Sequence, residues 1–162
     1  MRAGGETVFH CTIPWKILAA CQDRGQSSDM IVVDCTVVAD FFIGSPEMQS
    51  SVQRLLKLDS EWVAPVLWRY EFGHVLLKEV RGGRMSEELM DRFLAAAEEL
   101  ITESVVDFDA SKIVALALAR DLSFYDASYV WLGQTLGVPF YTRDGKLARK
   151  CEGLVHPMPV GE

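Results

Sequence analysis

The sequence predicts an α/β fold of three layers, in which a mainly parallel sheet of four to five strands lies between two layers of helices. Two observations carry this prediction. Short apolar, β-branched runs, typical of strands buried on both faces, alternate with segments of helical length and pattern. Turn and cap residues separate the two kinds of segment, so that each strand leads through helices into the next by a right-handed crossover.

The first half of this pattern begins at Met30. Ser45 followed by Pro46 is a typical helix start, and Gly82 with Gly83 is a typical helix end. The predicted elements are a strand at residues 31–33, helices at 35–43 and 46–58, a strand at 62–64, a helix from 65 to 80, and a helix capped by Ser86 that runs to about 101.

The second half continues the alternation. Asp109 is expected to cap a helix, Gly137 to end another, and Asp121 to occupy a left-handed position between them, which aspartate tolerates. The predicted elements are a strand at residues 105–106, a helix from 110 to about 120, a helix at 125–136, a strand at 138–141 and a candidate fifth strand at 154–155.

Residues 1–29 are expected to form an N-terminal extension, in which residues 13–21 have a helical pattern and 22–29 a polar one. Residues 30–157 are expected to form one domain and residues 158–162 a C-terminal tail. A chain of 162 residues is long enough to bury a core without disulfides or a structural metal.

The composition limits the classes of function. The net charge of −7 argues against a general electrostatic attraction for nucleic acid, although a bound divalent cation offsets acid locally. The four cysteines are scattered without metal-finger spacing, which favours free thiols in a reducing cytoplasm. No apolar run approaches the roughly 18 residues of a membrane span, so no membrane association is expected.

Four acids are candidates for a functional site. Asp34 and Asp144 follow the strands at 31–33 and 138–141, and ligands of open parallel sheets bind at the carboxyl ends of strands. Glu71 and Asp126 lie within predicted helices among apolar neighbours, where carboxylates are rare unless paired or bound to metal. Each acid alone is also explained by a cap or a salt bridge.

Taken together, the four acids predict a metal site. Converging carboxylates repel one another and hold protons unless a cation neutralises them. Oxygen ligands without thiolates or several histidines select Mg²⁺ or Mn²⁺, and such a site suits phosphoryl chemistry.

The motifs around these acids resemble those of PIN-domain proteins, and most closely those of VapC-like ribonuclease toxins. The matching segments are Asp34-Cys35-Thr36, Trp68-Arg69-Tyr70-Glu71, Leu122-Ser123-Phe124-Tyr125-Asp126-Ala127 and Tyr141-Thr142-Arg143-Asp144. Order and spacing agree over residues 30 to about 155.

The resemblance implies a PIN-like fold and an endoribonuclease, dependent on Mg²⁺ or Mn²⁺, that cuts tRNA, rRNA or mRNA. It also implies a homodimer and an antitoxin protein as partner. By this analogy Asp34, Glu71, Asp126 and Asp144 hold the metal directly or through water. Thr142 would position a ligand or water, and Thr36 would support the first motif.

A basic cluster surrounds the last acid and is the candidate RNA-binding surface. Its members are Arg143, Lys146, Arg149 and Lys150. The alternative interpretation is a solvated face at a helix C-terminus, where cations are favoured.

The sequence departs from the family at Cys35, where a small residue such as Ser or Ala is commoner. It also carries an additional acid, Asp40, interpreted as surface charge.

Two other functions remain open. A haloacid-dehalogenase-like phosphatase would use Asp34 as nucleophile, but Thr36 stands where its second acid is needed. A catalytically silent PIN-like module would bind RNA or protein only. His74, three residues after Glu71, is interpreted as structural rather than as part of a di-iron motif.

Overall fold

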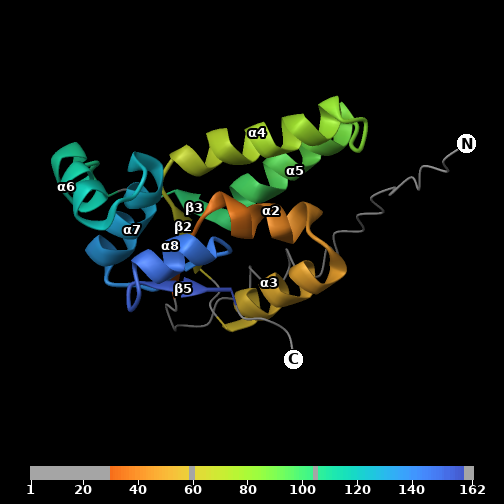
Figure 1. The fold of residues 1–162 in the computed structure, drawn as a ribbon. Coiled ribbons are helices and arrows are strands. Elements are labelled where there is room, and N and C mark those ends of the chain that lie inside the picture. Colours follow the sequence, from red (N-terminus) through yellow and green to blue (C-terminus); the bar gives the residue numbers. More distant parts are fainter. Residues whose placement is uncertain (1–29, 59–60, 104–105, 159–162) are drawn as a thin grey trace, which may run out of the picture.

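A computed structural model describes residues 30–58, 61–103 and 106–158. Within them, five strands form one sheet in the order β3-β2-β1-β4-β5, and all neighbouring strands are parallel. The strands are β1 (Met30–Val33), β2 (Glu61–Ala64), β3 (Ile101–Glu103), β4 (Phe140–Thr142) and β5 (Val155–Pro157), drawn in Figure 1. The predicted three-layer α/β class is confirmed.

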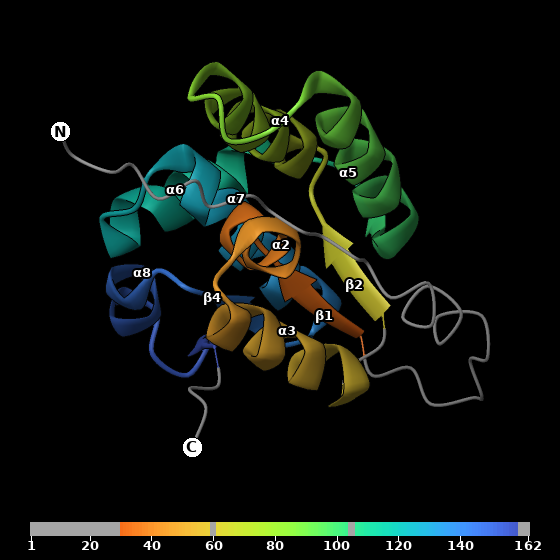
Figure 2. The ribbon, with the colours of Figure 1, turned by 90° about the vertical axis from the view of Figure 1, so that its right-hand side faces the viewer.

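Helices connect the strands in the predicted alternation. They are α2 (Cys35–Ile43), α3 (Pro46–Leu58), α4 (Leu67–Arg81), α5 (Glu87–Leu100), α6 (Ala110–Arg120), α7 (Phe124–Leu136) and α8 (Gly145–Lys150). The connections from β1 to β2 and from β3 to β4 cross the sheet in opposite directions, so right-handed crossovers place their helices on opposite faces. Figure 2 shows α2 and α3 in front of the sheet and α7 behind it.

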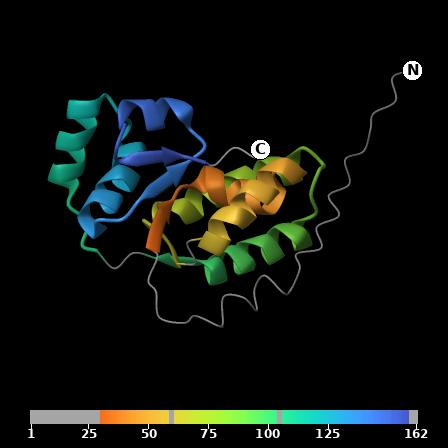
Figure 3. The same ribbon diagram turned by 90° about the horizontal axis from the view of Figure 1, so that it is seen from below.

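Aromatic packing fixes α4 against α2 and α5. The rings of Phe42 and Phe72 have centroids 5.5 Å apart, and those of Phe42 and Phe93 are 5.3 Å apart. Phe72 is fully buried, so the helix that carries the neighbouring Glu71 is anchored beside the sheet. Figure 3 shows α3 and α5 at one end of the molecule and α6 to α8 at the other.

Local capping explains why the helix starts were predictable. The side chains of Ser86 and Asp109 accept hydrogen bonds from the backbone N–H groups of Leu89 and Lys112. Asp121 ends α6 with φ 52°, in the left-handed conformation expected for it.

The prediction for the third strand was wrong. The strand is β3, directly after α5, while Val106 lies in a bend and residue 105 lies outside the described residues. Pairing decides its position, because Ile101 opposes Trp62 on β2 and is buried. The strand expected at 138–141 is shifted to Phe140–Thr142, and the short helix α8 was not predicted.

The expected extension at residues 1–29, its helical segment, and the last four residues of the tail lie outside the described residues. Among the helices of the described ranges, none has the length and apolar character needed to cross a bilayer.

Candidate active site

The strand order creates a switch point between β1 and β4. From β1 the chain goes first to β2 and β3 on one side, then returns to β4 and β5 on the other. Crevices at such points, outside the carboxyl ends of the strands, are the usual binding sites of open α/β sheets. Val33 pairs with Tyr141, so the next residues along each strand, Asp34 and Thr142, are brought side by side.

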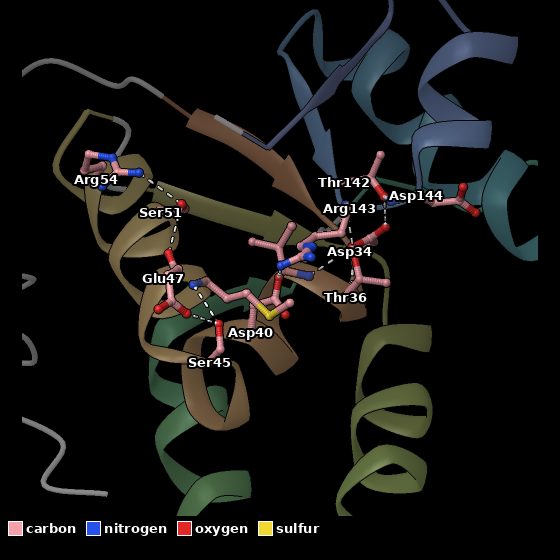
Figure 4. A network of polar contacts seen from close by, with 12 residues as sticks. Asp34, Thr36, Asp40, Ser45, Glu47, Ser51, Arg54, Thr142, Arg143 and Asp144 are labelled. Carbon is pink, nitrogen blue, oxygen red and sulfur yellow. Dashed lines mark hydrogen bonds and ion pairs between the residues drawn. The ribbon is translucent and has the colours of Figure 1, made fainter. Parts of the chain in front are cut away.

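Asp34 is the centre of a dense hydrogen-bond network, drawn in Figure 4. Its Oδ2 accepts from Thr142 Oγ1 at 2.5 Å. Its Oδ1 accepts from the backbone N–H groups of Thr36 at 2.9 Å and Val37 at 3.2 Å, which caps α2, and from the Thr36 hydroxyl at 2.5 Å. Burial raises the pKa of Asp34, and the hydrogen bonds from Thr142 and Thr36 partly offset this rise.

Glu71 approaches the same edge from α4. Its Oε2 accepts a hydrogen bond of 2.5 Å from the phenol of Tyr129 on α7. Partial burial raises the pKa of Glu71, the hydrogen bond from Tyr129 lowers it, and the charges of Asp34 and Asp126 raise it further. The charges of Asp34, which precedes α2, and of Asp126, in α7, therefore both act on Glu71 of α4.

Asp126 lies in the first turn of α7, where its backbone N–H donates to Ser123 Oγ at 3.0 Å and its Oδ2 accepts from the same hydroxyl at 2.7 Å. This reciprocal cap confirms that Asp126 lies at a helix start. It is also three residues before Tyr129, a spacing that places both on one face of α7.

Asp144 joins the network through its backbone rather than its carboxylate. Its N–H donates to Thr142 Oγ1 at 2.9 Å, while its Oδ1 accepts from the N–H groups of Lys146 at 2.7 Å and Leu147 at 3.2 Å and caps α8. Thr142 was predicted to position a ligand or water, and this role stays a prediction. In the structure its hydroxyl connects two acids, Asp34 and Asp144.

The donor set fits a hard divalent cation in its chemistry, because it consists of carboxylate oxygens that repel one another. In the part of the chain that the structure describes, no three acidic, histidine or cysteine side chains stand in positions to hold one ion together. Asp34, Asp126 and Asp144 are instead engaged with hydrogen-bond donors of their own helix starts.

The four predicted RNA-binding cations divide into two groups. Arg143 Nη1 is 2.8 Å from Asp40 Oδ2, and Lys150 Nζ pairs with Asp121 Oδ2 at 2.7 Å. Lys146 and Arg149 are exposed on α8.

The interpretation of Asp40 as plain surface charge was therefore wrong. Its side chain is only 14% exposed and faces Arg143. Burial raises the pKa of Asp40, and the Arg143 guanidinium partly offsets this.

Cys35, the departure from the family pattern, has a structural explanation. Cys35 is buried and free, and burial together with the charges of Glu71 and Asp34 raises the pKa of its thiol to about 12. It is therefore a protonated small side chain rather than a nucleophile. His74 is exposed on α4.

Sequence reasoning missed Tyr129, although its spacing from Asp126 would have placed the two on one helix face. It also missed the pairing of Asp40 with Arg143, for which no local pattern exists.

The chain is similar to known proteins named as ribonucleases. Ribonuclease VapC3 of Pyrobaculum aerophilum is 32% identical over 135 residues, which cover 78% of this chain and 98% of the relative. Ribonuclease VapC1 of Mycobacterium tuberculosis is 34% identical over 120 residues, which cover 74% of this chain and 90% of the relative. No family model matches the sequence.

Solved structures share the fold. The protein PAE2754 from Pyrobaculum aerophilum has a TM-score of 0.66 at 23% identity, covering 82% of this chain and 92% of that one. Mycobacterium tuberculosis VapC20, described as a toxin cleaving the sarcin–ricin loop, has a TM-score of 0.62 at 17% identity, covering 80% and 99%. VapBC2 from Rickettsia felis, solved with a fragment of promoter DNA, gives 0.59 at 10% identity, covering 80% and 99%.

Proposed function

Because the chain belongs to the VapC family of ribonucleases, we propose that it is a divalent-metal-dependent endoribonuclease and the toxin of a toxin–antitoxin pair. One observation carries this proposal beyond family membership. At the switch point of the sheet, Asp34 at the start of α2 and Asp126 in α7 both lie close enough to Glu71 of α4 for their charges to raise the pKa of Glu71. Carboxylates brought together in this way repel one another, and a bound cation relieves that repulsion.

We propose that Asp34, Glu71, Asp126 and Asp144 hold Mg²⁺ or Mn²⁺, directly or through water. A bound ion of this kind supplies an activated water and stabilises the negative charge that develops on the phosphodiester. The protein's own groups prepare the site: Thr142 and Thr36 fix both oxygens of Asp34. A carboxylate held in this way loses little side-chain freedom when it binds a ligand.

The proposed substrate is RNA, bound by the exposed cations Lys146 and Arg149 of α8 next to the acids. Such contacts would supply local attraction for phosphate in a chain whose net charge is −7. Residues 30–157 are the proposed nuclease domain, and residues 1–29 a proposed extension.

The proposed partners are a second copy of the chain and an antitoxin. Apolar side chains at the surface support a protein interface: Val114 and Leu118 of α6 are 45% and 80% exposed. Nearby, a hollow of about 210 Å³ is lined by Val66, Phe108 and Phe124 among others. The naming of a structural neighbour as a VapBC assembly supports the antitoxin.

The buried free thiols of Cys35 and Cys151 are compatible with the proposed reducing cytoplasm.

The phosphatase alternative is disfavoured by the position of Thr36. Two residues after Asp34, its hydroxyl donates to that carboxylate at 2.5 Å and accepts from Arg143 N–H at 3.1 Å. A hydroxyl used in this way does not replace the general acid that such a phosphatase needs.

The test is cleavage of total RNA and of defined tRNA and rRNA fragments by antitoxin-free protein, with Mg²⁺, with Mn²⁺ and with EDTA. Asp34→Asn and Asp126→Asn should each lose activity by orders of magnitude, because a metal carboxylate is removed. Asp91→Asn, at an exposed acid of α5, is the matched control and should cleave like the wild type.

Cleavage that survives EDTA or is equal in all variants would overturn the proposal and its site. Products with new internal ends would support the endonucleolytic assignment. Release of single nucleotides from one end would contradict it.

A further inference from the structure

The phenol of Tyr129 is the hydrogen-bond donor that the structure places on Glu71. The contact joins α7 to α4 across 58 residues of sequence, at an O–O distance of 2.5 Å. We propose that Tyr129 is a positioning residue of the site, whose hydroxyl holds the Glu71 carboxylate in the orientation that binds a divalent cation. This inference rests on the proposed metal-dependent function, since it assigns a role to Glu71 within it.

Tyr129 is a buried, closely packed side chain, whereas the Glu71 that it contacts is only partly buried. Its side chain is 3% exposed, and its ring stacks on Phe140 with centroids 5.7 Å apart and planes inclined by 15°. Phe140 is fully buried and opposes Val32 in the centre of the sheet. The ring is therefore held in place by its own helix, α7, and by its packing on β4.

Glu71 needs such a partner for two physical reasons. A glutamate has several rotatable side-chain bonds, so a half-buried carboxylate at the end of it populates many orientations unless something holds it. The charges of Asp34 and Asp126 also repel it. A hydrogen bond to Oε2 opposes both effects and selects one orientation of the carboxylate.

A purely structural tyrosine would make a different prediction. Buried phenols usually need some hydrogen-bond partner, and Glu71 could serve only as that partner. Removing the hydroxyl would then change the stability of the protein while leaving its affinity for a metal ion unchanged. If Tyr129 positions Glu71, metal affinity must change, and it must change through Glu71.

The experiment is a double-mutant cycle on Mn²⁺ affinity, measured by calorimetry or by the electron paramagnetic resonance of unbound Mn²⁺. Tyr129→Phe keeps the ring on Phe140 and removes only the hydroxyl. We expect it to weaken Mn²⁺ binding by about 10-fold, as loss of the partner that orients a metal ligand does. In a Glu71→Gln background the same substitution should cause no further loss.

Tyr70→Phe is the matched control. Its phenol is 75% exposed on the residue next to Glu71, so its removal should leave Mn²⁺ affinity at the wild-type value. Unchanged affinity in Tyr129→Phe, or equal losses in both backgrounds, would overturn the positioning role.

A second measurement remains decisive if Tyr129→Phe folds poorly. The ζ-carbon resonance of ¹³C-labelled Tyr129 should shift when Mg²⁺ is added to the wild type and not when it is added to Glu71→Gln. Equal shifts in the two proteins would contradict the proposal. The nuclease assignment is tested independently. If Mn²⁺ affinity depends on Tyr129 through Glu71 but the protein cleaves no RNA, the proposed function is wrong and the positioning role stands. A wild type that binds no Mn²⁺ overturns both.

Discussion

Thr142 donates its hydroxyl hydrogen to Asp34 across the β1–β4 pair, and the same oxygen accepts the backbone N–H of Asp144. One fully buried side chain thus links the acids that follow two neighbouring strands. The parallel register sets this arrangement, because the pairing of Val33 with Tyr141 places the following residues opposite each other.

Thr142→Val should therefore impair both chemistry and stability. The valine has nearly the same shape but neither donates to Asp34 nor accepts from Asp144. We expect a loss of about 1–3 kcal/mol in the free energy of unfolding, because a buried polar group loses its partner. Since the hydrogen bond lowers the pKa of Asp34, its loss should raise that pKa and shift the acidic limb of the pH–rate profile to higher pH.

Thr142→Ser keeps the hydroxyl and is the control for this substitution. It should retain the pH profile of the wild type in cleavage assays between pH 5 and pH 9. A profile that is the same in the valine and serine variants would contradict the role of the hydroxyl.

Asp34→Asn is expected to stabilise the protein while abolishing its activity. Asparagine still caps α2, but it lacks the charge whose burial raises the pKa of Asp34. An acid with a raised folded pKa stabilises the folded protein below its unfolded pKa of 3.8, and this stabilisation is lost as the pH rises through the folded pKa. At neutral pH the ionised Asp34 therefore lowers the free energy of unfolding relative to a neutral side chain.

Thermal unfolding in EDTA measures this effect. The variant should melt about 2–4 °C above the wild type at pH 7, the shift expected for about 1 kcal/mol in a chain of this size. The difference should shrink as the pH falls towards 4. A lower melting temperature for the variant at pH 7 would show that the hydrogen bonds of Asp34 outweigh its desolvation.

Arg143→Ala is expected to act on stability through Asp40. The substitution leaves a mostly buried carboxylate without its cation, so the pKa of Asp40 should rise further. A carboxyl with a raised folded pKa destabilises the fold only when it is ionised. The free energy of unfolding should therefore fall little at pH 5 and by about 1 kcal/mol at pH 8. Melting curves at the two pH values measure it.

The control is the double variant Asp40→Asn with Arg143→Ala, which removes the unpaired charge. Its stability should recover and lose its dependence on pH in this range. If the single and double variants lose equal stability, the ion pair does not hold α2 to the segment before α8.

The surface of α6 offers a test of self-association. Val114 and Leu118 are four residues apart and exposed, so they form an apolar stripe on one helix face. If α6 forms the proposed dimer interface, Leu118→Glu should raise the dimer dissociation constant at least 10-fold, because a charge would be buried in an apolar interface. Light scattering measures this change as a smaller fraction of dimer. Ser50→Glu, which adds the same charge at an exposed position of α3, should leave the proposed dimer unchanged. A Leu118→Glu protein that remains dimeric would move the interface elsewhere.

Local chemistry made most of the fold predictable, and long-range contacts account for what was not. Helix starts at Ser86 and Asp109 were readable because a cap is a property of three or four consecutive residues. The third strand was misplaced because α5 passes into β3 between Leu100 and Ile101 without a turn residue, so only pairing with β2 marks the change.

The same distinction holds for the site. The strand-end position of Asp34 follows from the order of strands and helices, which the sequence pattern carries. The contact between Tyr129 and Glu71 spans 58 residues, and that between Arg143 and Asp40 spans 103. No periodicity reports such pairs, so nothing in the sequence indicated that Arg143 contacts Asp40.

The division among the basic residues gives the last prediction. Lys146 and Arg149 are exposed on α8, whereas Arg143 and Lys150 are paired with Asp40 and Asp121. Lys146→Ala and Arg149→Ala should each weaken RNA binding and reduce the slope of log affinity against log salt by about 0.7–0.9, the value of one lost phosphate contact. Binding is measured with Asp126→Asn protein, so that the RNA stays intact, by fluorescence anisotropy from 50 to 300 mM salt. Lys112→Ala, at a residue of α6 paired with Asp109, is the control and should keep the original slope. Unchanged slopes for both α8 variants would mean that RNA approaches the acids from another direction.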